Sequence, residues 1–212
     1  HEMPWHKLDV VTYSWQKAMG GEAGFGMMLL GPRAAERLES FTPPWPIPKL
    51  FRLAKKQKII EGIFRGATIN TISMLAIEDA LDALRWVESI GGGPGMVARA
   101  EANFAVIDAW VARTPWVEFL ARDPATRSRS SLCLSITEDW FAALEESARW
   151  DIVGTFTKML EAEGAAFDIA THRAASPGLR IWSGGTVEES DLEKLLPWLD
   201  WAWSEIRAKH AV

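Results

Sequence analysis

Three polar clusters in the sequence carry residue types that could do chemistry, and the first is built around Lys17. This lysine ends a strand-like run over 10–16, and Gly20 and Gly21 follow it closely. An α/β sheet presents reactive groups at the carboxyl ends of its strands, and lysine amines form Schiff bases with carbonyl compounds. The position therefore suits a covalent lysine, although solvated lysines at strand ends are the commoner arrangement.

The second cluster, Gly66-Ala-Thr-Ile-Asn-Thr71, lies just before a predicted helix. The side chains of Asn70 and Thr71 could cap that helix. They could also bind an anion, helped by the free amides and the dipole of the helix. Both interpretations stay open on the sequence, and capping is the simpler one.

The third cluster combines Thr171-His-Arg173 with Arg180 in a mostly neutral stretch. Arginine binds carboxylate or phosphate through two parallel hydrogen bonds, so His172, Arg173 and Arg180 favour an anionic ligand. Surface salt bridges are the alternative. The sequence contains no zinc-ligand spacing, phosphate-binding P-loop or dinucleotide fingerprint, so no metal site is expected.

Strands and helices must position these clusters, and the hydrophobic pattern predicts both. The expected strands are 8–15, 25–30, 116–120, 131–136, 165–169 and 179–182. The expected helices are 32–38, 73–89, 96–112, 138–147, 150–163 and 186–209. The last helix would open with a capping box from Thr186 to Glu189. The proline-rich stretch 41–48 and the basic run 55–58 are expected to be loops.

The order of these elements divides the chain near Gly91-Gly-Gly-Pro94, which we expect to be a hinge. Residues 91–212 predict a small α+β layer domain. Two strands and a helix cannot close a core alone, so residues 1–90 are expected to be the C-terminal part of a larger α/β domain. The predicted fold class is therefore α/β.

Composition narrows the classes of partner. A net charge of -5 leaves no basic excess to neutralise phosphates, so no nucleic-acid partner is expected. The longest apolar run, 25–30, is too short to span a bilayer, and no export signal is recognised, so no membrane partner is expected. The single cysteine, Cys133, fits a packing role and a cytoplasmic protein.

Several motifs, taken together and in order, resemble the phosphoserine aminotransferase family, most closely its alphaproteobacterial form. The motifs are Val10-Val-Thr-Tyr-Ser-Trp-Gln-Lys-Ala-Met-Gly-Gly-Glu22, Glu61-Gly-Ile-Phe-Arg-Gly-Ala-Thr-Ile-Asn-Thr71, Pro177-Gly-Leu-Arg-Ile-Trp182, Pro43-Pro-Trp-Pro46 and Leu196-Pro-Trp-Leu-Asp200. The likeness implies the C-terminal half of a fold-type I transferase that depends on pyridoxal 5'-phosphate. Residues 1–90 would end the large cofactor-binding domain, and residues 91–212 would form the small C-terminal α+β domain.

The activity that the resemblance implies is amino transfer by a homodimer with an active site shared across its interface. Glutamate would give its amino group to 3-phosphohydroxypyruvate, which yields phosphoserine and 2-oxoglutarate in serine biosynthesis. The corresponding 4-phosphohydroxythreonine reaction of vitamin B6 synthesis is a possible second role. Two alternatives stay open: a related serine–glyoxylate-type aminotransferase, and a non-catalytic dimerising fragment.

The resemblance also implies cofactor contacts. Lys17 would bind the cofactor covalently, and Gln16 would hydrogen-bond the phenolic oxygen of the cofactor. Asn70 and Thr71 would reach the cofactor phosphate of the other subunit. The chain departs from the family at Ile72, where family members usually have proline, and this relaxes the backbone of Thr71.

The same resemblance implies the substrate contacts. His172 and Arg173 would bind the substrate's phosphate, and Arg180 would bind its α-carboxylate. A non-phosphorylated substrate needs no such pair, which separates the main interpretation from the serine–glyoxylate alternative. The family's aspartate for the pyridine nitrogen and its glycine-rich cofactor loop lie upstream of the residues present. We therefore expect the isolated chain to be inactive.

Overall fold

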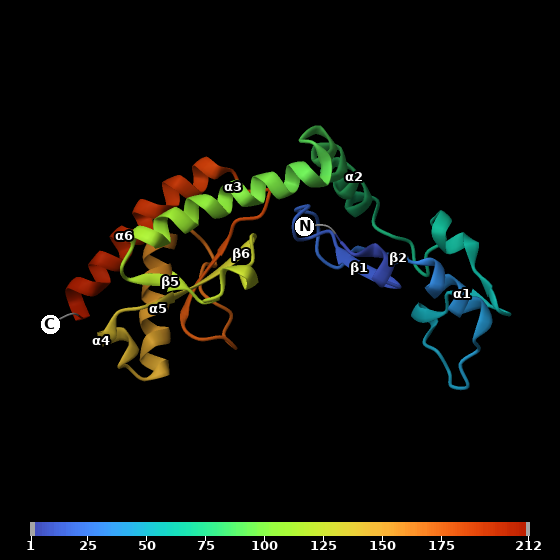
Figure 1. The fold of residues 1–212 in the computed structure, drawn as a ribbon, viewed down its shortest axis with the longest axis horizontal. Helices are drawn as coiled ribbons and strands as arrows, with labels where there is room; N and C mark the ends of the chain where they lie inside the picture. Colours follow the sequence, from blue (N-terminus) through green and yellow to red (C-terminus); the bar gives the residue numbers. More distant parts are fainter. Residues whose placement is uncertain (1–2, 211–212) are drawn as a thin grey trace. The chain divides into compact units, whose positions relative to one another are not determined.

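The computed structural model describes residues 3–210, which divide in sequence into two compact units between Ser89 and Ile90 (Figure 1). The first unit contains η1 (Trp5–Lys7), β1 (Val10–Ser14), β2 (Gly26–Leu30), α1 (Pro32–Ser40), η2 (Lys49–Phe51), β3 (Ala54–Lys55), β4 (Lys58–Ile59), η3 (Glu61–Arg65) and α2 (Met74–Ser89). The second contains α3 (Gly92–Arg113), β5 (Val117–Phe119), η4 (Pro124–Thr126), β6 (Ser131–Ile136), α4 (Asp139–Ala142), α5 (Glu146–Ala162), β7 (Gly178–Trp182) and α6 (Glu189–His210). Among these residues, no helix is both long and apolar enough to cross a bilayer.

The first unit is built on an antiparallel hairpin of β1 and β2. Its register runs from Val10 opposite Leu30 to Ser14 opposite Gly26. No residue of either strand is buried. A two-stranded hairpin of this kind is marginally stable in water, so its conformation depends on packing at its ends.

The core of the first unit is small and lies where the loop after β1 meets α2. Its buried apolar residues are Trp15, Ala76 and Ala80. The large apolar side chains of Met74 and Leu84 on α2 are exposed, whereas Ile77 is half-buried against this core. The helix therefore packs on Trp15 mainly through its two small alanines.

The second unit is a three-stranded antiparallel sheet, in the order β5-β6-β7, with helices on one face. Residues of β6 alternate between buried and half-buried, as expected of a strand with one covered face. The covered face includes Leu132 and Leu134 of β6 and Ile181 of β7. Figure 1 shows α3 and α6 running side by side in this unit. The opposite face of the sheet carries Arg180, which pairs across the strands with Cys133.

Tryptophans dominate the core of the second unit. Trp116 stacks on Trp203 with ring centroids 5.1 Å apart, and Trp110 meets Trp116 edge to face at 5.5 Å. The indole nitrogens of Trp110 and Trp116 both donate to the carboxylate of Asp200, each at 3.2 Å. One carboxylate on α6 thus satisfies two large apolar side chains that would otherwise bury unpaired N–H groups.

The prediction of a strand over 165–169 is wrong. None of its residues belongs to a strand, and the isolated bridge between Ala170 and Leu179 lies one residue beyond it. Asp168 has a φ of 52°, which is left-handed backbone that no strand contains. The apolar residues Ala166 and Ile169 are nevertheless buried, so the segment packs on the core without joining the ladder.

Three other local predictions need correction. The helix expected over 138–147 is only the short α4, which ends at Ala142, and α5 already begins at Glu146. The basic run 55–58 is not an open loop, because Lys55 pairs with Lys58 in the β3–β4 hairpin. Helix α6 begins at Glu189 and not at Thr186. The residues before α6 form a turn in which the Val187 N–H donates to the Gly184 carbonyl at 3.0 Å.

Candidate active site

Lys17 lies in a tight turn directly after β1. The strand ends at Ser14, and both Gln16 and Lys17 are exposed in the turn that follows. The Gly20 N–H donates to the Lys17 carbonyl at 3.0 Å, and the Gly21 N–H donates to the Trp15 carbonyl at 2.9 Å. The backbone around Lys17 is therefore fixed while its side chain stays accessible.

The loop that carries Lys17 is anchored at both ends. Trp15 stacks on Phe25 with ring centroids 5.9 Å apart, and the two residues are also joined by a backbone hydrogen bond of 3.2 Å. On α2, the Asp79 carboxylate accepts from the Glu22 N–H at 3.1 Å. A Cβ on Gly21 would lie only 3.2 Å from that carboxylate, so glycine permits this close approach.

Asn70 and Thr71 are exposed in the segment between η3 and α2. The hydroxyl of Thr68 donates to the Asn70 carbonyl at 2.6 Å. The cap of α2 is Ser73, whose hydroxyl accepts from the Ala76 N–H at 3.3 Å. Capping therefore does not occupy Asn70 or Thr71, and their side chains have no hydrogen-bond partner within residues 3–210.

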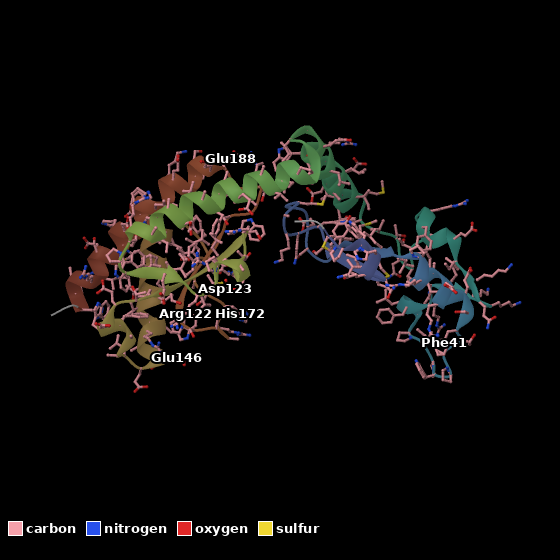
Figure 2. The ribbon with its side chains drawn as sticks, in the orientation of Figure 1. Phe41, Arg122, Asp123, Glu146, His172 and Glu188 are labelled. Atoms are coloured by element: carbon pink, nitrogen blue, oxygen red, sulfur yellow. The ribbon has the colours of Figure 1, made fainter. Side chains whose placement is uncertain are left out.

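His172 and Arg173 sit on an exposed loop just before β7 (Figure 2). The loop is closed by the Thr171 N–H donating to the Gly178 carbonyl at 3.0 Å and by the Thr171 hydroxyl donating to the Ser176 carbonyl at 2.7 Å. The ring Nδ1 of His172 accepts from the Ala174 N–H at 3.2 Å. This leaves the other ring nitrogen, Nε2, to donate outward.

Arg180 lies in the middle of β7 and has a carboxylate partner. Its Nη2 is 3.4 Å from Oδ2 of Asp168. The Asp168 side chain is 91% exposed, whereas that of Arg180 is 37% exposed. Ion pairs this exposed contribute little, so a ligand carboxylate could replace Asp168 at low cost.

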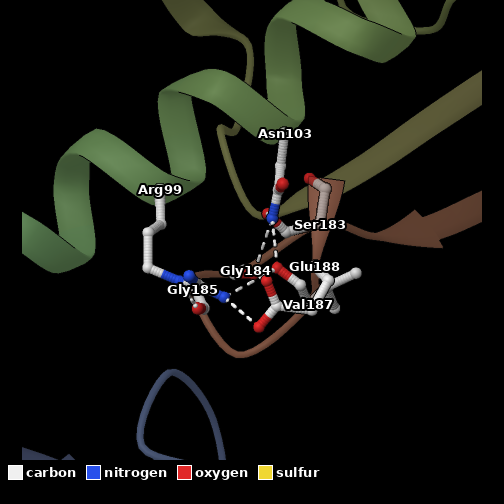
Figure 3. Close-up of polar contacts among 7 residues, drawn as sticks. All are labelled: Arg99, Asn103, Ser183, Gly184, Gly185, Val187 and Glu188. Atoms are coloured by element: carbon white, nitrogen blue, oxygen red, sulfur yellow. Dashed lines mark hydrogen bonds and ion pairs between the residues drawn. The ribbon is translucent and has the colours of Figure 1, made fainter. Parts of the chain in front are cut away.

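The turn after β7 is fixed by two residues of α3 that the sequence did not single out (Figure 3). The buried Asn103 amide donates to the carbonyls of Ser183, Gly184 and Val187 at 3.2, 3.1 and 2.9 Å. Arg99 donates to the Gly185 carbonyl and pairs with Glu188, both at 2.6 Å. In the sequence, the only sign of this role is that Asn103 lies among the apolar residues on one side of a predicted helix.

The two units carry candidate site residues of different chemical types. The first unit carries an amine, amides and a hydroxyl, at Lys17, Gln16, Asn70 and Thr71. The second carries an imidazole and two guanidinium groups, at His172, Arg173 and Arg180. Within residues 3–210, no group of three His, Cys, Asp or Glu side chains could hold a metal ion.

Known proteins resemble this chain in sequence. It is 47% identical over 206 residues to phosphoserine aminotransferase from Methanosarcina mazei, covering 97% of this chain and 53% of the relative. The enzyme from Methanosarcina barkeri is 46% identical over the same lengths, and that from Corynebacterium glutamicum is 24% identical over 91% of this chain. The chain thus spans about half the length of the curated relatives it matches. No protein-family model matches it.

Solved structures resemble the chain in fold. Phosphoserine aminotransferase from Bacillus circulans matches with a TM-score of 0.71 and 16% identity, over 96% of this chain and 49% of that one. The pyridoxal-phosphate-bound enzyme from Trichomonas vaginalis also has a TM-score of 0.71, with 18% identity over 93% of this chain and 49% of that one. The fold is therefore part of the fold-type I architecture of pyridoxal-phosphate-dependent transferases.

The relatives found by sequence identify the family more closely than the fold does. The chain is a homologue of the C-terminal half of phosphoserine aminotransferases, as its ordered motifs predicted. No finding bears on the likeness to the alphaproteobacterial form, which stays a prediction.

Proposed function

We propose that this chain forms part of a phosphoserine aminotransferase. The reaction would move the amino group of glutamate to 3-phosphohydroxypyruvate, giving phosphoserine and 2-oxoglutarate. The observation that carries the proposal is the 47% identity that extends over 97% of the chain. Because the chain spans about half of its relatives, we expect it to be inactive alone and to need the other half for turnover.

The available side chains fit pyridoxal phosphate. An aldehyde requires an amine, and Lys17 presents one on a fixed, accessible turn. The phenolic oxygen and the phosphate require N–H or O–H donors, which Gln16, Asn70 and Thr71 offer. None of these four side chains has a hydrogen-bond partner within residues 3–210. When bound, the cofactor supplies the electron sink for the reaction.

Lys17 would have two roles in this chemistry. Its amine would hold the cofactor between turnovers. Its Nζ would also act as the general base and acid at the substrate α-carbon. The anchors at Trp15 and Asp79 support this proposal, because a proton carrier must be held close to its target.

The second unit would select and orient the substrate. Arg180 would exchange its Asp168 partner for the substrate α-carboxylate. His172, through Nε2, and Arg173 would bind the phosphate. Alanine–glyoxylate aminotransferase from Nostoc shares the fold, with a TM-score of 0.65 and 14% identity, but a substrate without phosphate has no use for the His172–Arg173 pair.

Further expectations concern assembly and location. We infer a homodimer in which Asn70 and Thr71 serve the cofactor of the other subunit, and a cytoplasmic location. The exposed, unpartnered side chains of Asn70 and Thr71 support a partner outside the monomer. The 2-oxo acid that transamination converts to 4-phosphohydroxythreonine also carries a phosphate and a carboxylate, so it fits the same contacts as an amino acceptor.

The test is a hybrid enzyme in which this chain replaces the aligned 206 residues of the Methanosarcina mazei relative. Amino transfer from glutamate is measured with 3-phosphohydroxypyruvate and with glyoxylate as acceptors. We expect turnover with the phosphorylated acceptor and little with glyoxylate. A hybrid that folds and binds pyridoxal phosphate but prefers glyoxylate would contradict the proposed function.

A further inference from the structure

A cavity of the first unit is lined by none of the residues discussed above as site residues. It has a volume of about 680 Å³ and is formed by the end of α1, the proline-rich loop after it, and the β3–β4 hairpin. This volume lies within the range of small-molecule sites. Figure 2 labels Phe41, one of its walls, in the loop that follows α1.

The cavity is strongly cationic. Arg37, Arg52 and Lys56 line it, and none of its lining residues is acidic. The chain as a whole carries a net charge of -5, so this local excess runs against the composition. None of the three cations forms an ion pair within residues 3–210. Clustered cations without counter-charges attract an anionic ligand.

Both guanidinium groups are held in position, and both keep N–H groups available for a ligand. Arg52 donates through Nε to the Ile47 carbonyl at 2.8 Å, which leaves its two terminal nitrogens available. The guanidinium carbon of Arg37 sits 3.9 Å above the centre of the Phe41 ring. Arginine held in this way keeps its planar fork ready for bidentate binding of phosphate or carboxylate.

The third cation is presented by a strained turn. Lys56 and Gln57 occupy the two central positions of the β3–β4 hairpin with φ of 50° and 57°. Asparagine and glycine are preferred there, because left-handed backbone is unfavourable for other residues. The Gln57 amide donates to the Thr42 hydroxyl at 3.2 Å, which fixes the hairpin against the opposite wall. Left-handed backbone at residues other than glycine is found more often than usual at ligand sites.

The remaining walls are apolar and suit a flat ring. They include Phe41, Phe51, Ile47 and Leu53. We propose that this cavity is a binding site for a phosphomonoester that carries a planar, largely apolar ring. The phosphate dianion lies between Arg37, Arg52 and Lys56, and the ring lies against the aromatic walls. Pyridoxal phosphate itself belongs to this chemical class, so the test uses a probe without an aldehyde.

The experiment compares adenosine 5'-monophosphate, adenosine and inorganic phosphate on the intact chain by ¹H–¹⁵N NMR titration. We expect the monophosphate to bind at least tenfold more tightly than either component, with shifts centred on residues 37–57. Equal affinity for the monophosphate and inorganic phosphate would mean that only positive charge attracts the probe, and it would overturn the proposal. Shifts centred on 172–180, or binding abolished by Lys17→Ala, would also overturn it, because the probe would then occupy the proposed active site.

Matched variants locate the binding. Arg52→Gln and Lys56→Asn should each weaken monophosphate binding about three- to tenfold; asparagine at 56 tolerates the left-handed backbone, so that variant keeps the turn. Lys55→Gln and Lys58→Gln remove charge from the same hairpin outside the cavity lining and should change affinity less than twofold. Equal losses in all four variants would overturn the assignment to this cavity.

Discussion

The carboxylate of Asp79 on α2 accepts a hydrogen bond of 3.1 Å from the backbone N–H of Glu22, 57 residues earlier in the chain. This contact ties the loop of Lys17 to a helix, and the Trp15–Phe25 stack ties the same loop to the hairpin. The position of the Lys17 amine therefore depends on α2 as much as on β1.

Asp79→Ala should loosen this loop without unfolding the unit. The lost hydrogen bond to a charged acceptor is worth about 1 kcal/mol at an exposed site, which corresponds to roughly fivefold faster exchange of the Glu22 amide. Hydrogen exchange measured by NMR gives the value directly. Asp82→Ala, one turn further along α2 and without a hydrogen-bond or ion-pair partner in the described chain, is the control and should leave the Glu22 amide unchanged.

Asn103 should be a stabilising residue of the second unit. Asn103→Ala would remove the amide that donates to the carbonyls of Ser183, Gly184 and Val187, at a cost of about 2–3 kcal/mol in the free energy of unfolding by urea. Asn103→Asp keeps the size of the side chain but removes the N–H groups. If the aspartate variant were as stable as the parent, hydrogen bonding would not be the role of Asn103.

Two glycines of the second unit should respond to alanine with opposite signs. A Cβ on Gly184 would come within 2.5 Å of the Trp182 ring, so Gly184→Ala should destabilise the fold by about 1–3 kcal/mol. A Cβ on Gly154 in α5 meets nothing within 4 Å, so Gly154→Ala should stabilise the helix by about 0.5–1 kcal/mol. Thermal unfolding of both variants checks the pair, and a shared sign would contradict the described packing.

Arg173 should act on phosphorylated substrates selectively. In the hybrid enzyme, Arg173→Ala should remove hydrogen bonds to a charged group worth about 1.5–3 kcal/mol, or roughly a tenfold to hundredfold loss of kcat/KM for 3-phosphohydroxypyruvate. Lys158→Ala, which removes an exposed positive charge from α5, is the control. Equal losses for phosphorylated and plain acceptors would rule out a phosphate contact.

The pattern of the sequence predicted most elements because the local signals agree with the packing. The alternating residues of β6 and the apolar run of β2 became strands where expected. The prediction of a strand over 165–169 failed because the apolar residues of this segment pack on the core through a left-handed turn at Asp168. The hydrophobic pattern does not indicate such a turn. The side of α2 that is buried was also unpredictable, because two alanines match the Trp15 ring better than the larger residues do.

The candidate site was predictable only through ordered motifs. The positions of Lys17 and Arg180 in their strands are common ones for such residues. Their assignment to an active site came from several motifs that follow one another in the expected order. The supports of the site were missed because they act at long range. Asp79 holds a loop 57 residues away, and Asn103 holds a turn that begins 80 residues away. No local pattern marks such a partner before the fold brings it close.

Lys17 should be the residue that holds the cofactor. The most direct test is to treat the hybrid enzyme, loaded with pyridoxal phosphate, with borohydride and to map the modified peptide by mass spectrometry. We predict that the reduced cofactor is attached to Lys17 and that the label disappears in Lys17→Ala but persists in Lys7→Ala. A cofactor attached to another lysine, or a label that survives Lys17→Ala, would contradict the assignment.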